Sequence, residues 1–164
     1  MEGFEQLSHG VEAAHLASGA VDWLVDRVAV DAEDPSLYQG LAGMVLALRE
    51  AQVHFGDDRH GRVIARATDA LTDMVDSLKD CSLYFGLAGV AVALRALGRG
   101  AAADRALGRI WERFDGERWN DMFELFVGNA GIGLGALHAG EVDLAVTAVT
   151  PYLTTADPTP WGVN

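Results

Sequence analysis

Cysteine is nearly absent from this sequence, which has only Cys81 among its 164 residues. A single cysteine cannot form a disulfide within the chain, and such usage is typical of a reducing compartment, so we expect a cytoplasmic protein. Proline is also scarce, with four residues, and no Ser/Gly-rich linker interrupts the chain. We therefore predict one domain over residues 1–164.

Basic side chains are in short supply: 12 Lys and Arg stand against 24 Asp and Glu, for a net charge of −12. Phosphate backbones and anionic lipid repel such a chain, which argues against nucleic acid and membrane surfaces as partners. A cationic or neutral peptide fits better, although an acidic surface also simply keeps a protein soluble. The sequence has neither a signal peptide pattern nor the uncharged apolar run of about 18 residues that a membrane span needs.

A repeated motif organises the hydrophobic half of the residues. The segment 36–49 (SLYQGLAGMVLALR) is matched by 82–95 (SLYFGLAGVAVALR), and more loosely by 124–137 (ELFVGNAGIGLGAL). The matched glycines Gly40, Gly86 and Gly128 are 46 and then 42 residues apart. A period of this length is typical of one helical hairpin per repeat.

Each copy of the motif predicts the start of an apolar helix. Ser36 is the expected N-cap, with Gln39 completing a capping box, and Ser82 repeats the cap. A glycine within a helix costs about 1 kcal/mol relative to alanine, yet paired glycines recur in all three copies: Gly40 and Gly43, Gly86 and Gly89, Gly128 and Gly131. Close helix packing and an open backbone beside a cavity are two explanations, and both can hold.

Amphipathic helices alternate with these glycine helices. Residues 10–30, 59–78, 101–114 and 141–153 each carry one apolar stripe at helical spacing. The glycine helices are apolar nearly all round, so they form an inner layer and the amphipathic helices an outer one. We predict an all-α fold, a partial α/α toroid of tandem helical hairpins. Because its last apolar face is uncovered, we expect a homo-oligomer or a complementary C-terminal half.

The pattern Ser-Leu-Tyr-x-Gly-Leu-Ala-Gly, followed by an Ala/Leu-rich helix, resembles the glycine motif of the lanthionine synthetase C-like family. The resemblance extends from Val11 onward. It implies a toroid of about seven inner and seven outer helices. It also implies a zinc ion, held by two cysteines and a histidine, that activates a thiol of a precursor peptide. The thiolate adds to a dehydrated serine or threonine, which closes a thioether ring in the lanthipeptide precursor.

The sequence departs from this family where the metal binds. The family's ligands lie in later repeats, in a Trp-Cys segment and a Cys-His pair, and neither occurs here. We expect about three and a half of the seven repeats, no metal ligands, no catalytic residues and no cofactor in this chain, with zinc in a full-length member. The chain alone should lack cyclase activity, whether it is a fragment, a split protein or a degenerate paralogue. A non-catalytic peptide- or protein-binding module is the alternative.

The loops before the glycine helices would rim the central cavity of a toroid, where they could meet the precursor peptide. We predict a substrate-binding rim from their acidic and aromatic side chains: Asp34, Tyr38, Asp80, Tyr84, Trp119, Asp121 and Glu124. The alternative is structural, because carboxylates also stabilise helix N-termini. A glycoside hydrolase would need a carboxylate pair facing the cavity, and Asp34 and Glu124 are too far apart in sequence to claim one.

Overall fold

The computed structural model describes residues 2–30, 33–155, 158–159 and 162–163. The described part is almost entirely helical, which confirms the all-α prediction. Its elements are α1 (Glu2–Val30), α2 (Leu41–Phe55), α3 (Gly61–Met74) with a 3₁₀ turn (Val75–Ser77), α4 (Leu87–Ala96), α5 (Gly100–Trp111), α6 (Asn129–His138) and α7 (Val142–Thr155). Two-residue strands, β1 (Pro158–Thr159) and β2 (Gly162–Val163), pair antiparallel. None of the described helices combines the length and hydropathy needed to cross a membrane.

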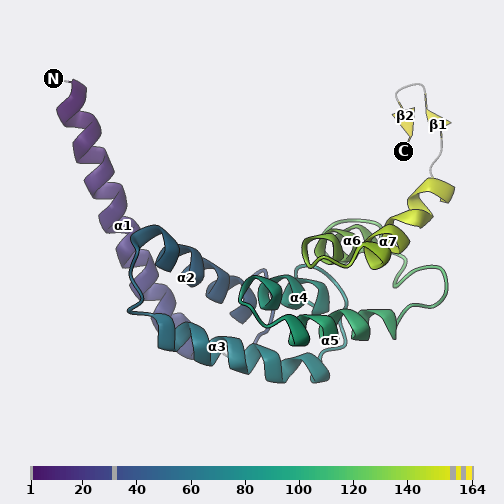
Figure 1. The fold of residues 1–164 in the computed structure, drawn as a ribbon. Coiled ribbons are helices and arrows are strands. Elements are labelled where there is room, and N and C mark those ends of the chain that lie inside the picture. The colour runs from purple at the N-terminus through teal and green to yellow at the C-terminus, as the bar shows by residue number, and fades with distance from the viewer. Residues whose placement is uncertain (1, 31–32, 156–157, 160–161, 164) are drawn as a thin grey trace.

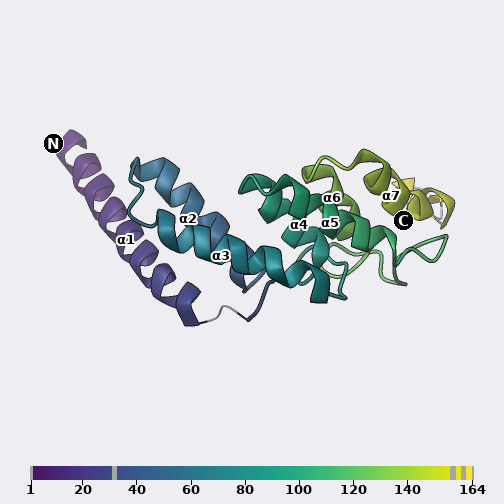
Figure 2. The same ribbon diagram turned by 60° about the horizontal axis from the view of Figure 1, so that its bottom comes forward.

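The helices form an open arc of two layers (Figure 1). The glycine helices α2, α4 and α6 follow one another along the concave side, and α3 and α5 lie along the convex side. Figure 2 shows the same succession as a row, with α1 at one end and α7 at the other. The arrangement is the partial toroid of tandem hairpins that the sequence predicts.

The apolar stripes of the outer helices face the core. In α3, Ile64 and Leu71 are buried, and in α5 Leu107 and Ile110 are buried, as the periodicity predicts. Helix α4 is buried on almost every side, because helices of both layers surround it. Burial of these stripes is the main driving force for the fold.

The glycine helices begin about four residues later than predicted. Their first residues are Leu41, Leu87 and Asn129, and the preceding glycines take the N-cap position without a side-chain cap. The predicted capping box is wrong: the Ser36 hydroxyl accepts the Gln39 backbone N–H (3.3 Å) inside a loop. The loop doubles back on the helix, and the Asp34 carbonyl accepts the Leu41 N–H at 2.7 Å.

Candidate functional site

Three loops of similar construction precede the glycine helices, and we call residues 34–40, 80–86 and 122–128 the glycine loops. In the first, the Asp34 carboxylate accepts the Ser36 N–H at 2.8 Å. In the second, the Asp80 carboxylate accepts the Ser82 N–H at 2.7 Å, and the Ser82 hydroxyl accepts the Phe85 N–H at 3.3 Å. Short polar side chains that bind nearby backbone groups favour such turns over helix.

The third loop reaches a similar shape with different residues. Glu124 stands where the other copies have serine, and its carboxylate accepts the N–H groups of Val127 (2.7 Å) and Phe126 (2.5 Å). These bonds to Val127 and Phe126 lower the pKa of Glu124, because they stabilise the ionised form. Two backbone donors are thereby satisfied by one exposed side chain.

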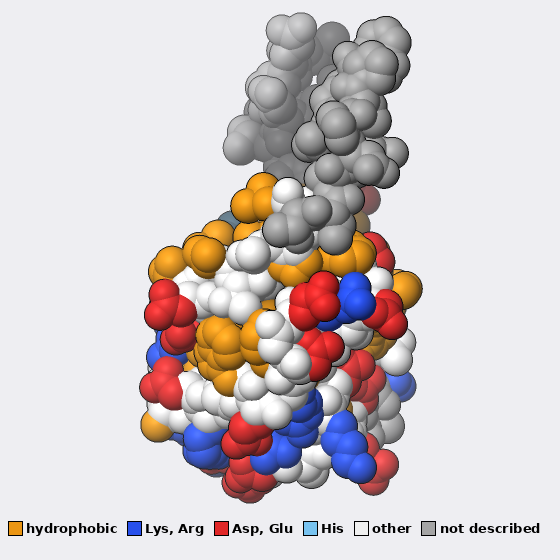
Figure 3. Space-filling model, turned by 90° about the vertical axis from the view of Figure 1, so that its right-hand side faces the viewer, with side chains coloured by type: hydrophobic (Ala, Val, Ile, Leu, Met, Phe, Trp, Pro, Cys, Tyr) orange, Lys and Arg blue, Asp and Glu red, His pale blue; other side chains and the backbone are white. Residues whose placement is uncertain are grey.

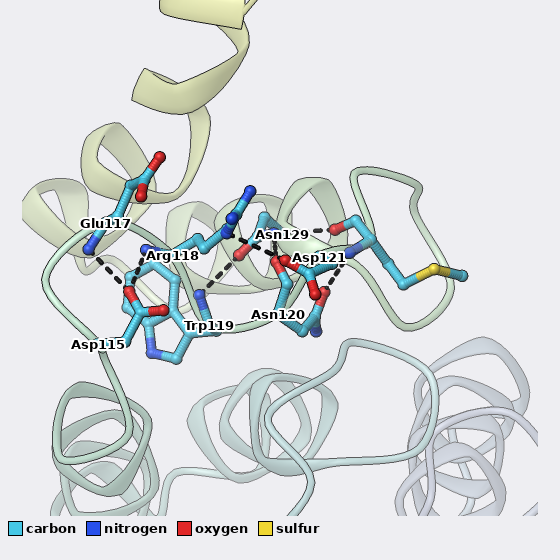
Figure 4. Close-up of polar contacts among 8 residues, drawn as sticks. Asp115, Glu117, Arg118, Trp119, Asn120, Asp121 and Asn129 are labelled. Atoms are coloured by element: carbon cyan, nitrogen blue, oxygen red, sulfur yellow. Dashed lines mark hydrogen bonds and ion pairs between the residues drawn. The ribbon is translucent and has the colours of Figure 1, made fainter.

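Asn129, at the start of α6, is fully buried and holds the third loop together (Figure 4). Its side-chain oxygen accepts the Trp119 N–H at 3.0 Å. Its amide donates to the carbonyls of Asn120 and Met122, both at 2.8 Å. Sequence reasoning missed this residue. The signal was a polar side chain at the position where the other copies have leucine, Leu41 and Leu87.

Backbone hydrogen bonds join the three loops side by side. The N–H groups of Leu37 and Tyr38 both donate to the Tyr84 carbonyl at 3.0 Å. The Tyr84 N–H in turn donates to the Phe126 carbonyl at 3.3 Å. The same position of each repeat is therefore brought next to its counterpart in the following repeat.

This pairing builds a column of four aromatic rings, which we call the aromatic column: Tyr38, Tyr84, Phe85 and Phe126. Tyr84 and Phe126 stack with centroids 4.5 Å apart. Tyr38 meets Tyr84 and Phe85 edge-on at 5.9 and 5.7 Å. The column is open to solvent, since Tyr38 is 60% and Phe126 48% exposed. Exposed clustered aromatic rings are common at binding surfaces, where they bury large areas with little loss of conformational freedom.

Comparison with known proteins identifies these repeats. A model of the lanthionine synthetase C-like protein family matches residues 31–158. The chain belongs to this family. The match contains the three glycine loops and helices α2 to α7. A search of curated proteins and a search of solved structures each returned no match.

The second glycine of each lanthionine synthetase C-like motif lies at a close contact. A β-carbon on Gly89 would meet the Leu83 carbonyl oxygen and lie 2.9 Å from the Leu37 Cβ of the preceding repeat. On Gly131 it would meet the Leu125 carbonyl and lie 3.1 Å from the Leu83 Cβ. Contacts under 3.0 Å do not occur between real side chains. These positions therefore require glycine, first because the carbonyl of their own loop leaves no room for a β-carbon, and second because a leucine of the previous repeat packs on them.

The structure places the residues predicted to bind substrate in different settings. Tyr38 and Tyr84 lie in the aromatic column, and Asp34, Asp80 and Glu124 accept backbone N–H groups of the glycine loops, so their hydrogen bonds are structural. Asp121 is 90% exposed and pairs with Arg118 at 3.2 Å.

Trp119 is set apart from the aromatic column. Its ring contacts Trp111 and Phe114, at 5.8 and 4.7 Å, and its indole N–H donates to the Ile110 carbonyl at 2.6 Å. These contacts fix the segment after α5 against the core. That any of the seven residues contacts a substrate remains a prediction.

The zinc of the lanthionine synthetase C-like family does not fit the described residues. In residues 2–30, 33–155 and the short strands, no group of three or more His, Cys, Asp or Glu is placed to hold a metal ion. Burial raises the pKa of the Cys81 thiol to about 11; the charge of Arg113 lowers it and that of Asp80 raises it. A thiol with this pKa is protonated at neutral pH, and metals bind the thiolate.

Proposed function

We propose that this lanthionine synthetase C-like protein acts in the cytoplasm in thioether ring formation, as a part that binds the precursor peptide. The observation that carries the proposal is the aromatic column, where four rings lie together and three of them are exposed. Aromatic side chains are the commonest anchors of protein–peptide interfaces. We assign the ring-closing chemistry to residues other than the four of the aromatic column.

The acid–base and nucleophilic groups near the column support binding rather than catalysis. The Glu124 carboxylate, with its lowered pKa, is ionised at neutral pH and occupied by two backbone donors. Cys81 is protonated there. A column flanked by such groups offers contact area and hydrogen-bonding backbone, but no poised proton donor or nucleophile.

A second candidate is a non-catalytic module that holds a basic peptide outside any cyclase. The net charge of −12 favours it, since long-range attraction would draw a cationic peptide to the protein. The two candidate functions differ in how the affinity for the peptide should depend on salt. Aromatic contacts are insensitive to salt, whereas attraction between opposite charges is screened by it.

Fluorescence anisotropy tests both candidates with one probe: a fluorescein-labelled peptide with a lysine-rich half and a half containing serine, threonine, cysteine and leucine-aromatic pairs. We expect binding that Tyr38→Ala and Tyr84→Ala each weaken about tenfold, the loss of one well-packed ring. Phe55→Ala is the matched control, because Phe55 is also an exposed ring, 36%, but lies at the far end of α2.

Three results separate the candidates. Binding that depends on Tyr38 and persists at high salt supports the proposal. Binding that is lost at high salt and is unaffected by either tyrosine supports the basic-peptide module. An absence of binding at protein concentrations up to about 1 mM, where even weak complexes form, contradicts both.

A further inference from the structure

A cavity of about 420 Å³ lies between α1, α3 and the start of α2. Ligand pockets commonly have volumes of roughly 300–1,000 Å³, so this cavity is large enough for a small molecule. Three of its apolar lining residues are buried, one from each helix: Val28, Leu41 and Ala67. The cavity therefore reaches the hydrophobic core of the fold.

Two opposite charges also line the cavity, Asp26 on α1 and Arg66 on α3. Both residues are exposed, and among the residues that the structure describes neither has an ion-pair or side-chain hydrogen-bond partner. The contact between the two helices is made one turn earlier in α1, where the Asp22 carboxylate lies 3.8 Å from the His60 imidazole. A carboxylate and a guanidinium are therefore available to a ligand from different walls.

The next pair of outer helices, α3 and α5, is joined by arginine side chains at the corresponding place. Arg105 and Arg109 are the sixth and tenth residues of α5. Arg105 donates to the Thr72 carbonyl of α3 at 3.3 Å, and the Arg109 guanidinium lies 3.9 Å from the Asp76 carboxylate beside it. Two long side chains thus span the space between these helices.

The sixth and tenth residues of α3 are Arg66 and Ala70, and both line the cavity. Ala70 has no side chain that could reach α1, and Arg66 has no partner on α1 among the described residues. The cavity therefore results from a short side chain between two neighbouring helices of the arc, and not from the end of the row of repeats.

We propose that this cavity binds a free α-amino acid with an aliphatic side chain of about the size of leucine. The ammonium group pairs with Asp26, the carboxylate pairs with Arg66, and the side chain lies on the apolar lining. A molecule with one charge would leave the other wall without a partner, whereas a zwitterion satisfies both. The aromatic column is not part of this cavity, so the inference does not rest on the proposed function.

Exposed apolar side chains alone would not specify such a ligand. At the α6–α7 end of the arc, Leu137 and Val146 are each 57% exposed, and Figure 3 shows hydrophobic side chains on that face. The cavity differs from that face because opposite charges stand on two of its walls beside an apolar lining. These charges determine which ligand chemistry fits.

Three small molecules with the same aliphatic tail test the proposal: L-leucine, 4-methylpentanoate, which lacks the amine, and 3-methylbutylamine, which lacks the carboxylate. Amide chemical shifts of Val63, Ala67 and Ala70 in nitrogen-15 NMR spectra at neutral pH report binding. We expect a dissociation constant of about 1 mM for L-leucine. The other two should bind about tenfold more weakly, the usual effect of losing one hydrogen bond between charged groups.

Substitutions at the two walls separate the contributions of the two charges. Arg66→Gln should weaken L-leucine about tenfold without weakening 3-methylbutylamine, and Asp26→Asn should weaken L-leucine about tenfold without weakening 4-methylpentanoate. Arg62→Gln is the matched control, because Arg62 is an exposed arginine of α3 that does not line the cavity. Far-ultraviolet circular dichroism verifies that the variants are folded, as expected for exposed positions.

Dependence of L-leucine binding on both Asp26 and Arg66 supports the proposal. Equal affinity for L-leucine and 3-methylbutylamine would assign the cavity to an amphipathic cation, and equal affinity for L-leucine and 4-methylpentanoate would assign it to an amphipathic anion. Either result overturns the amino acid. An absence of shifts at about 10 mM L-leucine overturns the site itself. Peptide binding and its loss in Tyr38→Ala are measured separately, so these results leave the proposed function intact.

Discussion

Leu37 and Gly89 lie 52 residues apart in neighbouring repeats, and a β-carbon on Gly89 would lie 2.9 Å from the Leu37 Cβ and closer still to the Leu83 carbonyl oxygen. We expect Gly89→Ala to lower the free energy of unfolding by about 1–3 kcal/mol, the usual effect of overpacking a tight contact. Alanine's better helix propensity offsets part of this loss. Urea unfolding followed by circular dichroism measures it.

Gly108→Ala is the control for that substitution. Gly108 also lies within a helix, α5, but nothing lies within 4 Å of the β-carbon that it would gain. The same chemical change should therefore raise the free energy of unfolding by roughly 0.5–1 kcal/mol. Similar effects at both positions would contradict the interpretation that the Leu83 carbonyl and the Leu37 side chain leave no room for a β-carbon at Gly89.

Asn129 should be among the most sensitive polar residues in the chain. Asn129→Ala removes three side-chain hydrogen bonds and takes their partner from the Trp119 N–H and the Asn120 carbonyl, whereas the Met122 carbonyl keeps the backbone N–H of residue 129. Unpaired buried groups cost about 1–3 kcal/mol each, so we expect a loss of at least 2 kcal/mol in thermal or urea unfolding. Gln39→Ala, which truncates an exposed amide, should change stability by less than about 0.5 kcal/mol.

The ionisation of Glu124 should make the stability of the fold depend on pH. Its pKa in the fold is below the ordinary value of 4.5, so folding favours the ionised carboxylate. Its contribution to stability is complete above that ordinary value and disappears as the pH falls through the lowered pKa. Unfolding experiments between neutral pH and acid should therefore show a smaller loss for Glu124→Gln than for the unsubstituted chain.

The pKa of the carboxyl can be read separately by carbon-detected NMR titration. A Glu124 pKa at or above 4.5 would contradict the hydrogen bonds to Val127 and Phe126. Asp115 also has a lowered pKa, from backbone hydrogen bonds to Arg118 and Glu117. The unsubstituted chain and Glu124→Gln both contain Asp115, so the comparison between them removes its contribution.

Cys81 should react slowly with disulfide reagents. A pKa raised from 9.0 to about 11 reduces the thiolate population near neutral pH about a hundredfold. We expect slow release of thionitrobenzoate from Ellman's reagent, rising steadily up to about pH 11, and fast release in guanidinium chloride. Fast reaction of the folded chain at pH 7.5 would show that the thiol is not desolvated.

The sequence predicted the layers better than the starts of the helices. The apolar stripes of α3 and α5 could be predicted from the sequence because buried residues recur with the helical period. Ile64, Leu71, Leu107 and Ile110 are examples. The start at Ser36 was wrong because serine is equally suited to a helix cap and to a turn. Only the fold decides between them, through the Asp34 carbonyl that takes the Leu41 N–H.

Only part of the candidate site could be predicted from the sequence. Tyr38 and Tyr84 were recognisable as equivalent positions, but their stacking with Phe126 depends on backbone pairing between loops more than 40 residues apart. Trp119 follows no repeat position, so nothing in the sequence indicated its packing on Phe114.

The hydrogen bonds from each glycine loop to the next affect how the protein unfolds. Loops usually open by themselves, but the amides of Tyr38 and Tyr84 are bonded across repeats, so releasing one loop disturbs its neighbour. Neighbouring hairpins are coupled in this way at their rims as well as through their cores. Deuterium uptake at these two amides should then be as slow as in the helices, and heating should melt the repeats in a single transition.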